Sequence, residues 1–149
     1  MIINFKDFSV KTSVAEVGGK AYNLMKMMKD GINVPEGFTL SVEFFDAWFK
    51  ELKDSHQWKD FYVAAKSGKV TKEQCDALKD AAESFTLTEE QKNELNTALE
   101  AISRNRVLAV RSSSPEEDTS SSSFAGIYET YLGIDRDNLE NSIRECFKS

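Results

Sequence analysis

Cysteine, proline and histidine are scarce in this chain of 149 residues, which contains two cysteines, two prolines and one histidine. Cys75 and Cys146 lie far apart, without CxxC or metal-type spacing, so we expect free thiols in a reducing, cytoplasmic compartment. His56 stands among polar residues at a predicted helix end, which indicates a surface position. We therefore do not expect a Ser-His-Asp triad built on this histidine.

Long apolar runs and an excess of positive charge are also absent. No apolar run approaches the roughly 20 residues of a membrane-spanning helix, so we expect a soluble protein without a membrane partner. The N-terminal MIINFKDFSV lacks the basic start and apolar stretch of a signal peptide. The net charge of −6 argues against nucleic acid as a partner, because non-specific binding needs a dense positive field. A small anionic ligand needs only one or two local cations.

The chain does contain enough apolar residues for a core, with 40% hydrophobic and 11% aromatic residues. It forms one domain, or part of a larger one. Strands are predicted at 2–5, after the proline turn within 34–40, at 107–110 and at 127–134. The 107–110 strand is expected to be buried, since all its residues are apolar. We predict an α+β fold, with a small, mostly antiparallel sheet and helices packed to one side.

Helical periodicity is strong in the first half of the chain. A glycine turn opens a helix that Gly31 ends, and its apolar face is predicted to hold Leu24, Met27 and Met28. Ser41 is expected to cap the next helix. The stripe of that helix is aromatic and apolar: Phe44, Phe45, Trp48, Phe49 and Leu52.

The middle of the chain, residues 52–104, is predicted to be a helical subdomain. One stripe consists of Trp58, Phe61 and Ala65, and Gly68 ends that helix. The motifs TKEQ, from Thr71, and TEEQ, from Thr88, are capping boxes that begin two more helices. The stripes of those helices are Leu78, Ala81, Ala82 and Phe85, and then Leu95, Leu99 and Ile102. We assign all these stripes to the core.

The end of the chain is also predicted to be helical. Asp135 is expected to cap a final helix with Leu139, Ile143 and Phe147 on one face. That helix still continues at the last residue, so we expect the chain to be a piece of a longer protein.

The motif Gly18-Gly19-Lys20 is a candidate phosphate site. Glycines let a ligand approach the backbone, and the amides and dipole at a helix start suit an anion. A lysine there is unfavourable without an anion. The motif is not a Walker A loop, because Val14 and Ala21 stand where that loop needs glycine and a hydroxyl residue. The alternative is an exposed lysine after a turn.

Arg111 ends the apolar 107–110 run and begins a serine-rich segment. An arginine at a strand end suits bidentate phosphate binding, and the serines after it, including Ser112, Ser113 and Ser123, offer further donors. The alternatives are an ion pair of Arg111 with the acidic run at 116–118, and a solvated or phosphorylated serine linker. The same acidic run is a weak metal candidate, because consecutive carboxylates on a loop commonly face water.

Three motifs in this order resemble a known family. VGGKAYNL, VPEGF and VRSSSPEEDTSSSSFAGIYETYL are similar to the N-terminal nucleotide-binding part of phosphoenolpyruvate synthase and pyruvate phosphate dikinase, which rifampin phosphotransferases share. The resemblance implies the first lobe of an ATP-grasp fold. It also implies that Lys20, Arg111, Gly126 and Thr130 bind ATP phosphates. The serine-rich stretch that includes Ser112, Ser113 and Ser123 would cover those phosphates.

The resemblance further implies the activity and the missing parts. The family is a group of ATP-dependent phosphotransferases. In the synthase and the dikinase, ATP phosphorylates a histidine on a separate domain, and that phosphohistidine serves pyruvate on another. A second ATP-grasp lobe would supply the adenine contacts and the Mg²⁺ ligands, so we expect no metal site in this chain and no activity from it alone. We expect a phosphoenolpyruvate synthase-like enzyme. The alternatives are a rifampin phosphotransferase or a dikinase, and a non-catalytic module that binds a partner through Phe44 and Trp48.

Overall fold

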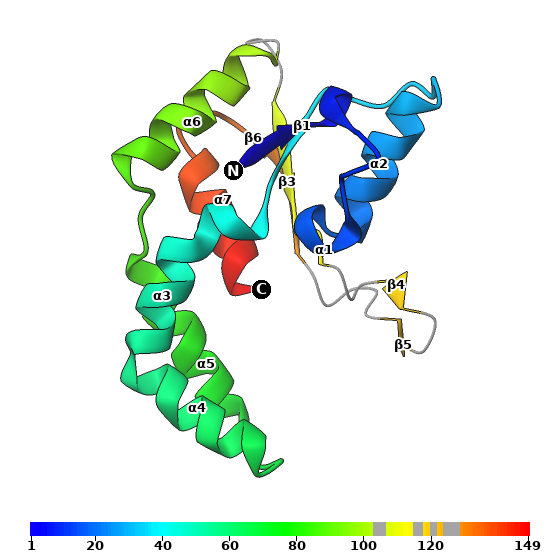
Figure 1. Cartoon of the computed structure of the whole chain (residues 1–149). Helices are drawn as coiled ribbons and strands as arrows, with labels where there is room; N and C mark the ends of the chain where they lie inside the picture. Colours follow the sequence, from blue (N-terminus) through cyan, green and yellow to red (C-terminus); the bar gives the residue numbers. More distant parts are fainter. Residues whose placement is uncertain (103–106, 115–117, 120–121, 124–128) are drawn as a thin grey trace.

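The computed structural model describes residues 1–102, 107–114, 118–119, 122–123 and 129–149 (Figure 1). For residues 118–119 and 122–123 it describes the backbone only. The α-helices are α1 (Val14–Val17), α2 (Gly19–Lys29), α3 (Asp46–Asp54), α4 (His56–Lys66), α5 (Lys72–Ala81), α6 (Glu89–Glu100) and α7 (Leu139–Lys148). Short 3-10 turns are η1 (Phe5–Asp7), η2 (Val42–Phe45) and η3 (Ala82–Ser84). The strands are β1 (Ile2–Asn4), β2 (Phe38–Leu40), β3 (Leu108–Arg111), β4 (Asp118–Thr119), β5 (Ser122–Ser123) and β6 (Thr130–Ile134).

The described strands form three antiparallel pairs rather than the one small sheet that was predicted. β1 pairs with β2, β3 with β6, and β4 with β5. A two-stranded pair is marginal alone and needs a helix against it. α7 packs on β3 and β6, and α6 packs against β1. The mixed α+β class is confirmed, while the grouping of residues 52–104 into a subdomain stays a prediction.

Strand β3 is half-buried, which makes the prediction of a fully buried strand wrong. Leu108 and Val110 are partly covered, whereas Ala109 and Arg111 are exposed. Val107, just before the strand, is 71% exposed. The described structure covers one face of the β3–β6 pair with α7, so side chains alternate between that face and solvent.

The main core is aromatic and joins the helices to the strands. Trp48 is 1% exposed, and its indole Nε1 donates a hydrogen bond to the Thr86 carbonyl at 2.9 Å. Phe44 is 3% exposed beside it. These two side chains are therefore not available as a partner surface, which contradicts the hypothesis of a binding module built on them. The other buried members of this core are Ala82, Phe85, Leu87, Leu95, Leu99, Leu139 and Ile143.

A second, smaller core lies where α1 and α2 meet. Its buried members are Val17, Ala21 and Met25. The predicted apolar face of α2 was wrong, since Met27 is 39% exposed and Leu24 is only partly covered. Helix α2 instead packs through Ala21 and Met25, because η1 and α1 lie on that side.

Helices α4 and α5 pack on each other and extend away from the β1–β2 and β3–β6 pairs (Figure 1). Neither helix has a buried residue, so the core assignment was too strong for the stripe of α4 and for Leu78 and Ala81 of α5. It is confirmed for Ala82 and Phe85, which follow α5 and are buried in the main core. Trp58 and Phe61 are half-buried and Ala65 is exposed. The stripe of α6 differs, because Leu95 and Leu99 are buried in the main core and Ile102 is 9% exposed.

Helix ends follow local sequence closely, with two exceptions. Both capping boxes, at Thr71 and Thr88, are formed on the backbone and the side chain. Gly31 has φ +81°, as a helix-ending glycine requires. Ser41 is wrong as a cap of α3: it precedes η2, and its fully buried Oγ has no hydrogen-bond partner. Asp135 does not cap α7 either, because it accepts the N–H of Asn138, the residue before the helix, at 2.9 Å.

Candidate functional site

The start of α2 lies against the chain that leaves β3. The backbone N–H of Gly19 donates to the Ser114 carbonyl at 3.1 Å, and the N–H of Ala21 donates to Ser113 Oγ at 3.0 Å. Two of the motifs that the sequence singled out therefore meet in space, although they are far apart in the chain. We call residues 112–114 the serine segment from here on.

Gly18 permits this contact. Its φ is +78°, a conformation that other residues rarely adopt. A Cβ at this position would lie 1.9 Å from the carbonyl oxygen of Ser113, which is far inside van der Waals contact. A side chain at residue 18 would thus displace the serine segment from α2.

The two predicted phosphate-binding cations flank this contact. Lys20 stands in the first turn of α2, between Gly19 and Ala21. Arg111 is the exposed last residue of β3, opposite Thr130 of β6 in the antiparallel register. No ion pair joins Arg111 to another described side chain, and the acidic run proposed as its alternative partner has no described side chains.

The serine side chains have different roles at this site. Ser113 Oγ accepts a helix amide, and the N–H of Ser112 donates to the Glu129 carbonyl at 3.4 Å. Ser112 Oγ is buried without a hydrogen-bond partner. The expectation that the amides at the start of α2 are free for an anion is wrong for Gly19 and Ala21, because the serine segment occupies them. Gly126 and the side chain of Ser123 lie outside the described residues.

The half-buried thiol of Cys146, on α7, lies beside Glu129, the residue before β6. Cys146 Sγ lies 3.9 Å from the Glu129 carbonyl oxygen. Burial, and then the negative charge of Glu129, raise the pKa of the Cys146 thiol to about 11, while the charge of Lys20 opposes this shift. The phenol of Tyr131 donates to the Glu129 carboxylate, and that hydrogen bond raises the pKa of Tyr131. Sequence reasoning missed this cluster, since no spacing connects Glu129 with Cys146.

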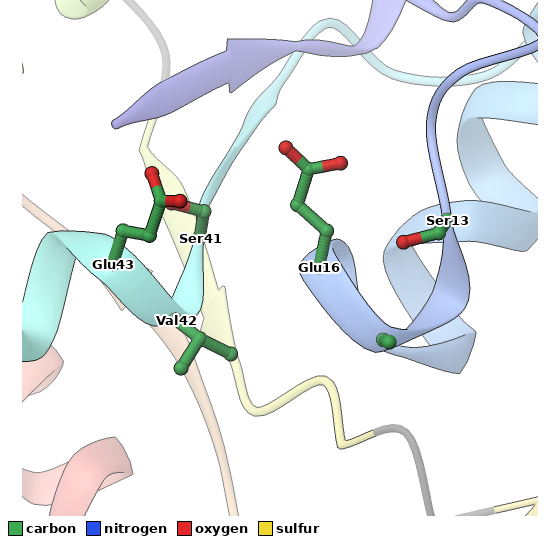
Figure 2. A pocket seen from close by; sticks show the side chains of 6 residues that line it. Ser13, Glu16, Ser41, Val42 and Glu43 are labelled. Carbon is green, nitrogen blue, oxygen red and sulfur yellow. The ribbon is translucent and has the colours of Figure 1, made fainter.

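An acidic pocket of about 340 Å³ lies between α1 and the β2–η2 junction (Figure 2). Figure 2 shows Glu16 and Glu43 on its opposite sides. Among the described residues, its lining consists of Ser13, Ala15, Glu16, Ser41, Val42 and Glu43, without lysine or arginine. Its charge suits a cation and opposes a phosphate, so it is distinct from the site around Lys20 and Arg111.

The remaining candidates carry little chemistry. His56 is exposed, as predicted, and its Nδ1 lies 3.1 Å from Asp60 one helical turn away. Within the described part of the chain, no three metal-ligating side chains gather into a group. That Mg²⁺ ligands lie elsewhere stays a prediction. Among the same residues, no helix has the length and apolar character needed to cross a membrane.

The motifs that form this site fall within a match to one family. Residues 14–149 match the family described as the pyruvate phosphate dikinase, AMP/ATP-binding domain. The chain belongs to this family. The match covers Gly18, Lys20, the serine segment, Arg111 and Thr130, and it confirms the resemblance seen in the sequence.

Similar proteins of this family include several phosphotransferases. An uncharacterized phosphotransferase, YvkC, of Bacillus subtilis is 31% identical over 134 residues, which cover 89% of this chain and 14% of that protein. A rifampicin phosphotransferase of a Streptomyces species is 26% identical, over 100% of this chain and 18% of its own length. The phosphoenolpyruvate synthase of Pyrococcus furiosus is 26% identical, over 97% and 22% respectively. The chain thus spans between 14% and 22% of the length of these relatives.

Proposed function

We propose that this chain forms the phosphate-binding part of the ATP site in an ATP-dependent phosphotransferase. The observation that carries the proposal is the contact between the start of α2 and the serine segment, because it brings Lys20 and Arg111 to one region of the molecule. Membership of an AMP/ATP-binding domain family supports a nucleotide as the ligand. In this proposal the fold is the first lobe of an ATP-grasp.

Each residue has a role that follows from its chemistry. The Lys20 ammonium acts as a point charge on a phosphate oxygen, and the planar Arg111 guanidinium binds two oxygens at once. Thr130 lies opposite Arg111 and offers a hydroxyl donor, and we place Gly126 beside it. Phosphoryl transfer depends mainly on positioning and on neutralising charge over the transferred group. This lobe supplies both without a covalent step of its own.

We place the rest of the reaction outside these residues. The phosphate acceptor, the Mg²⁺ ligands, the adenine contacts and the phosphorylated histidine belong to the other parts of the enzyme, since this chain spans a small fraction of its relatives. We favour pyruvate as the final acceptor, giving phosphoenolpyruvate. Rifampicin is the alternative acceptor, because relatives of both kinds match this chain.

Calorimetric titration with magnesium-ATP tests the proposal on this chain. Arg111→Ala and Lys20→Ala should each abolish or strongly weaken the binding seen with the wild type, with unchanged circular dichroism. Lys26→Ala is a matched control, because Lys26 is an exposed lysine in the last turn of the same helix. Wild-type affinity in both site variants would refute the assignment of these two cations.

The same two substitutions can be made in the complete enzyme. There, loss of one charged phosphate contact should cost about 2–4 kcal/mol of transition-state stabilisation, by analogy with other preorganised donors. A complete enzyme whose kcat/KM for ATP is unchanged in both variants would contradict the proposed role of this lobe.

A further inference from the structure

The serine segment makes a double hydrogen bond to the start of α2. The Ser114 carbonyl accepts the N–H of Gly19 at 3.1 Å, and Ser113 Oγ accepts the N–H of Ala21 at 3.0 Å. The first amides of a helix have no partner inside the helix. Here two of them are bonded by one short segment, which acts as an N-cap contributed from a distant part of the chain.

Gly18 provides independent evidence that this contact is close. The backbone carbonyl carbon of Ser113 lies 2.3 Å from where a Cβ of residue 18 would be. Gly18, Gly19 and Ala21 are all buried. The two segments therefore lie in direct contact at Gly18, against both the backbone and the Oγ of Ser113.

Both cations are connected to this contact by very short stretches of chain. Lys20 lies between the two amides that the serine segment holds. Arg111 lies two residues before Ser113, and it is held by pairing with Thr130 and by the bond from Ser112 N–H to the Glu129 carbonyl. The contact therefore fixes the position of Lys20 relative to Arg111.

We infer that Ser113 is a positioning residue, which holds the start of α2 so that Lys20 and Arg111 engage the same polyphosphate. This inference rests on the proposed function and changes the role expected for Ser113. Its hydroxyl acts on the helix amide of Ala21, and the phosphate meets the two cations. A serine here adds no charge to the site, but it sets the distance between two charges.

The contact itself is tested without nucleotide, by amide hydrogen exchange and backbone relaxation of the chain. Ser113→Ala should raise the exchange rate of the Ala21 amide by about tenfold, as loss of one ordinary hydrogen bond predicts, and should lower the order parameter of Lys20. Ser113→Thr keeps the hydroxyl and should restore both values. Unchanged exchange at Ala21 in Ser113→Ala would overturn the contact.

Ser55→Ala is the matched control. Ser55 Oγ accepts the N–H of Trp58 at 3.1 Å, so it caps α4 in the same way but far along the chain from the α2 site. This variant should lower thermal stability as Ser113→Ala does, while it leaves exchange at Ala21 and affinity for ATP unchanged. The comparison separates positioning from a general loss of stability.

Titration with magnesium-ATP tests the positioning role. Ser113→Ala should weaken ATP binding by about tenfold although it removes no charge, because misplacing a group costs affinity as well as rate. Ser113→Thr should rescue it. Faster exchange at Ala21 with unchanged affinity would overturn the positioning role and leave the proposed function intact. If the folded Lys20→Ala and Arg111→Ala variants both bind ATP with the affinity of the wild type, the proposed function is refuted, and the positioning role with it.

Discussion

At the scale of single residues, the thiol of Cys146 shows how neighbours change the chemistry of one side chain. It is half-buried beside the Glu129 carbonyl, on helix α7, which covers β3 and β6. Burial and the charge of Glu129 raise its pKa to about 11. The thiolate is the reactive form of cysteine, so this residue should be nearly inert at neutral pH.

Alkylation kinetics check this expectation. At pH 8 a thiol of pKa about 11 is about 0.1% ionised, against about a quarter for an ordinary thiol of pKa near 8.5. In a Cys75→Ser background, iodoacetamide should therefore modify Cys146 on the order of a hundredfold more slowly in the folded chain than in urea. Equal rates in the two states would show that the site leaves the thiol unperturbed.

The same shift predicts a dependence of stability on pH. The folded pKa is raised above the unfolded value, so the folded state binds this proton more tightly. The contribution of the protonated thiol is complete below about pH 8.5 and is lost as the pH rises through about 11. Urea unfolding between these pH values should show a decline that is smaller in Cys146→Ala.

At the scale of helices and strands, short sequence motifs predicted helix starts more reliably than apolar spacing predicted buried faces. The capping boxes at Thr71 and Thr88 were predicted because each needs only four consecutive residues. The buried face of α2 was mispredicted. The prediction relied on large apolar residues such as Met27, which is exposed, whereas the small Ala21 is buried in the second core. Which face of a helix is covered depends on its neighbours, and no periodicity in α2 itself identifies η1 and α1.

The two capping boxes give a matched pair of substitutions. Thr88 caps α6, whose Leu95 and Leu99 belong to the main core, whereas Thr71 caps α5, which has no buried residue. Thr88→Ala should lower the free energy of unfolding by about 1 kcal/mol, the usual cost of a lost N-cap. Thr71→Ala should mainly accelerate amide exchange within α5. Equal global losses would show that α5 unfolds together with the core.

The candidate site was predicted in part for the same reason. Lys20 and Arg111 were singled out from short motifs and Thr130 from the family resemblance, and their roles at a phosphate stay predictions. The antiparallel register places Arg111 opposite Thr130. The contact of Ser113 with Ala21 was not predicted, because it joins residues separated by 92 positions. A serine-rich segment carries no sign of which hydroxyl bonds to the protein and which to a ligand.

At the scale of the whole molecule, the aromatic core around Trp48 connects the helices with one another. Its ring lies 5.2 Å from that of Phe147 on α7 and 6.0 Å from that of Phe85, measured between ring centroids. Its indole N–H is bonded to the Thr86 carbonyl. Removing this side chain leaves a cavity in the main core and removes the hydrogen bond to the Thr86 carbonyl.

Trp48→Ala should therefore cost about 3–5 kcal/mol, as large-to-small substitutions of buried aromatic residues do. Trp58→Ala is the control, because the half-buried Trp58 on α4 contacts only Phe61 and Tyr62 among described aromatic rings. Urea unfolding followed by circular dichroism measures both. A loss in Trp48→Ala no larger than in Trp58→Ala would contradict the central place of this core.

The bond between Ala21 and Ser113 also has a consequence for biosynthesis. Since 92 positions separate its partners, Ala21 leaves the ribosome long before Ser113 is translated. The α4–α5 pair contains only neighbouring segments, and its contacts can form while synthesis continues. The start of α2 must wait with its amides bonded to water. The nascent chain can therefore form α4 and α5 before Ser113 reaches the start of α2, so a product released before residue 113 would contain these two helices but would lack the contact at the start of α2.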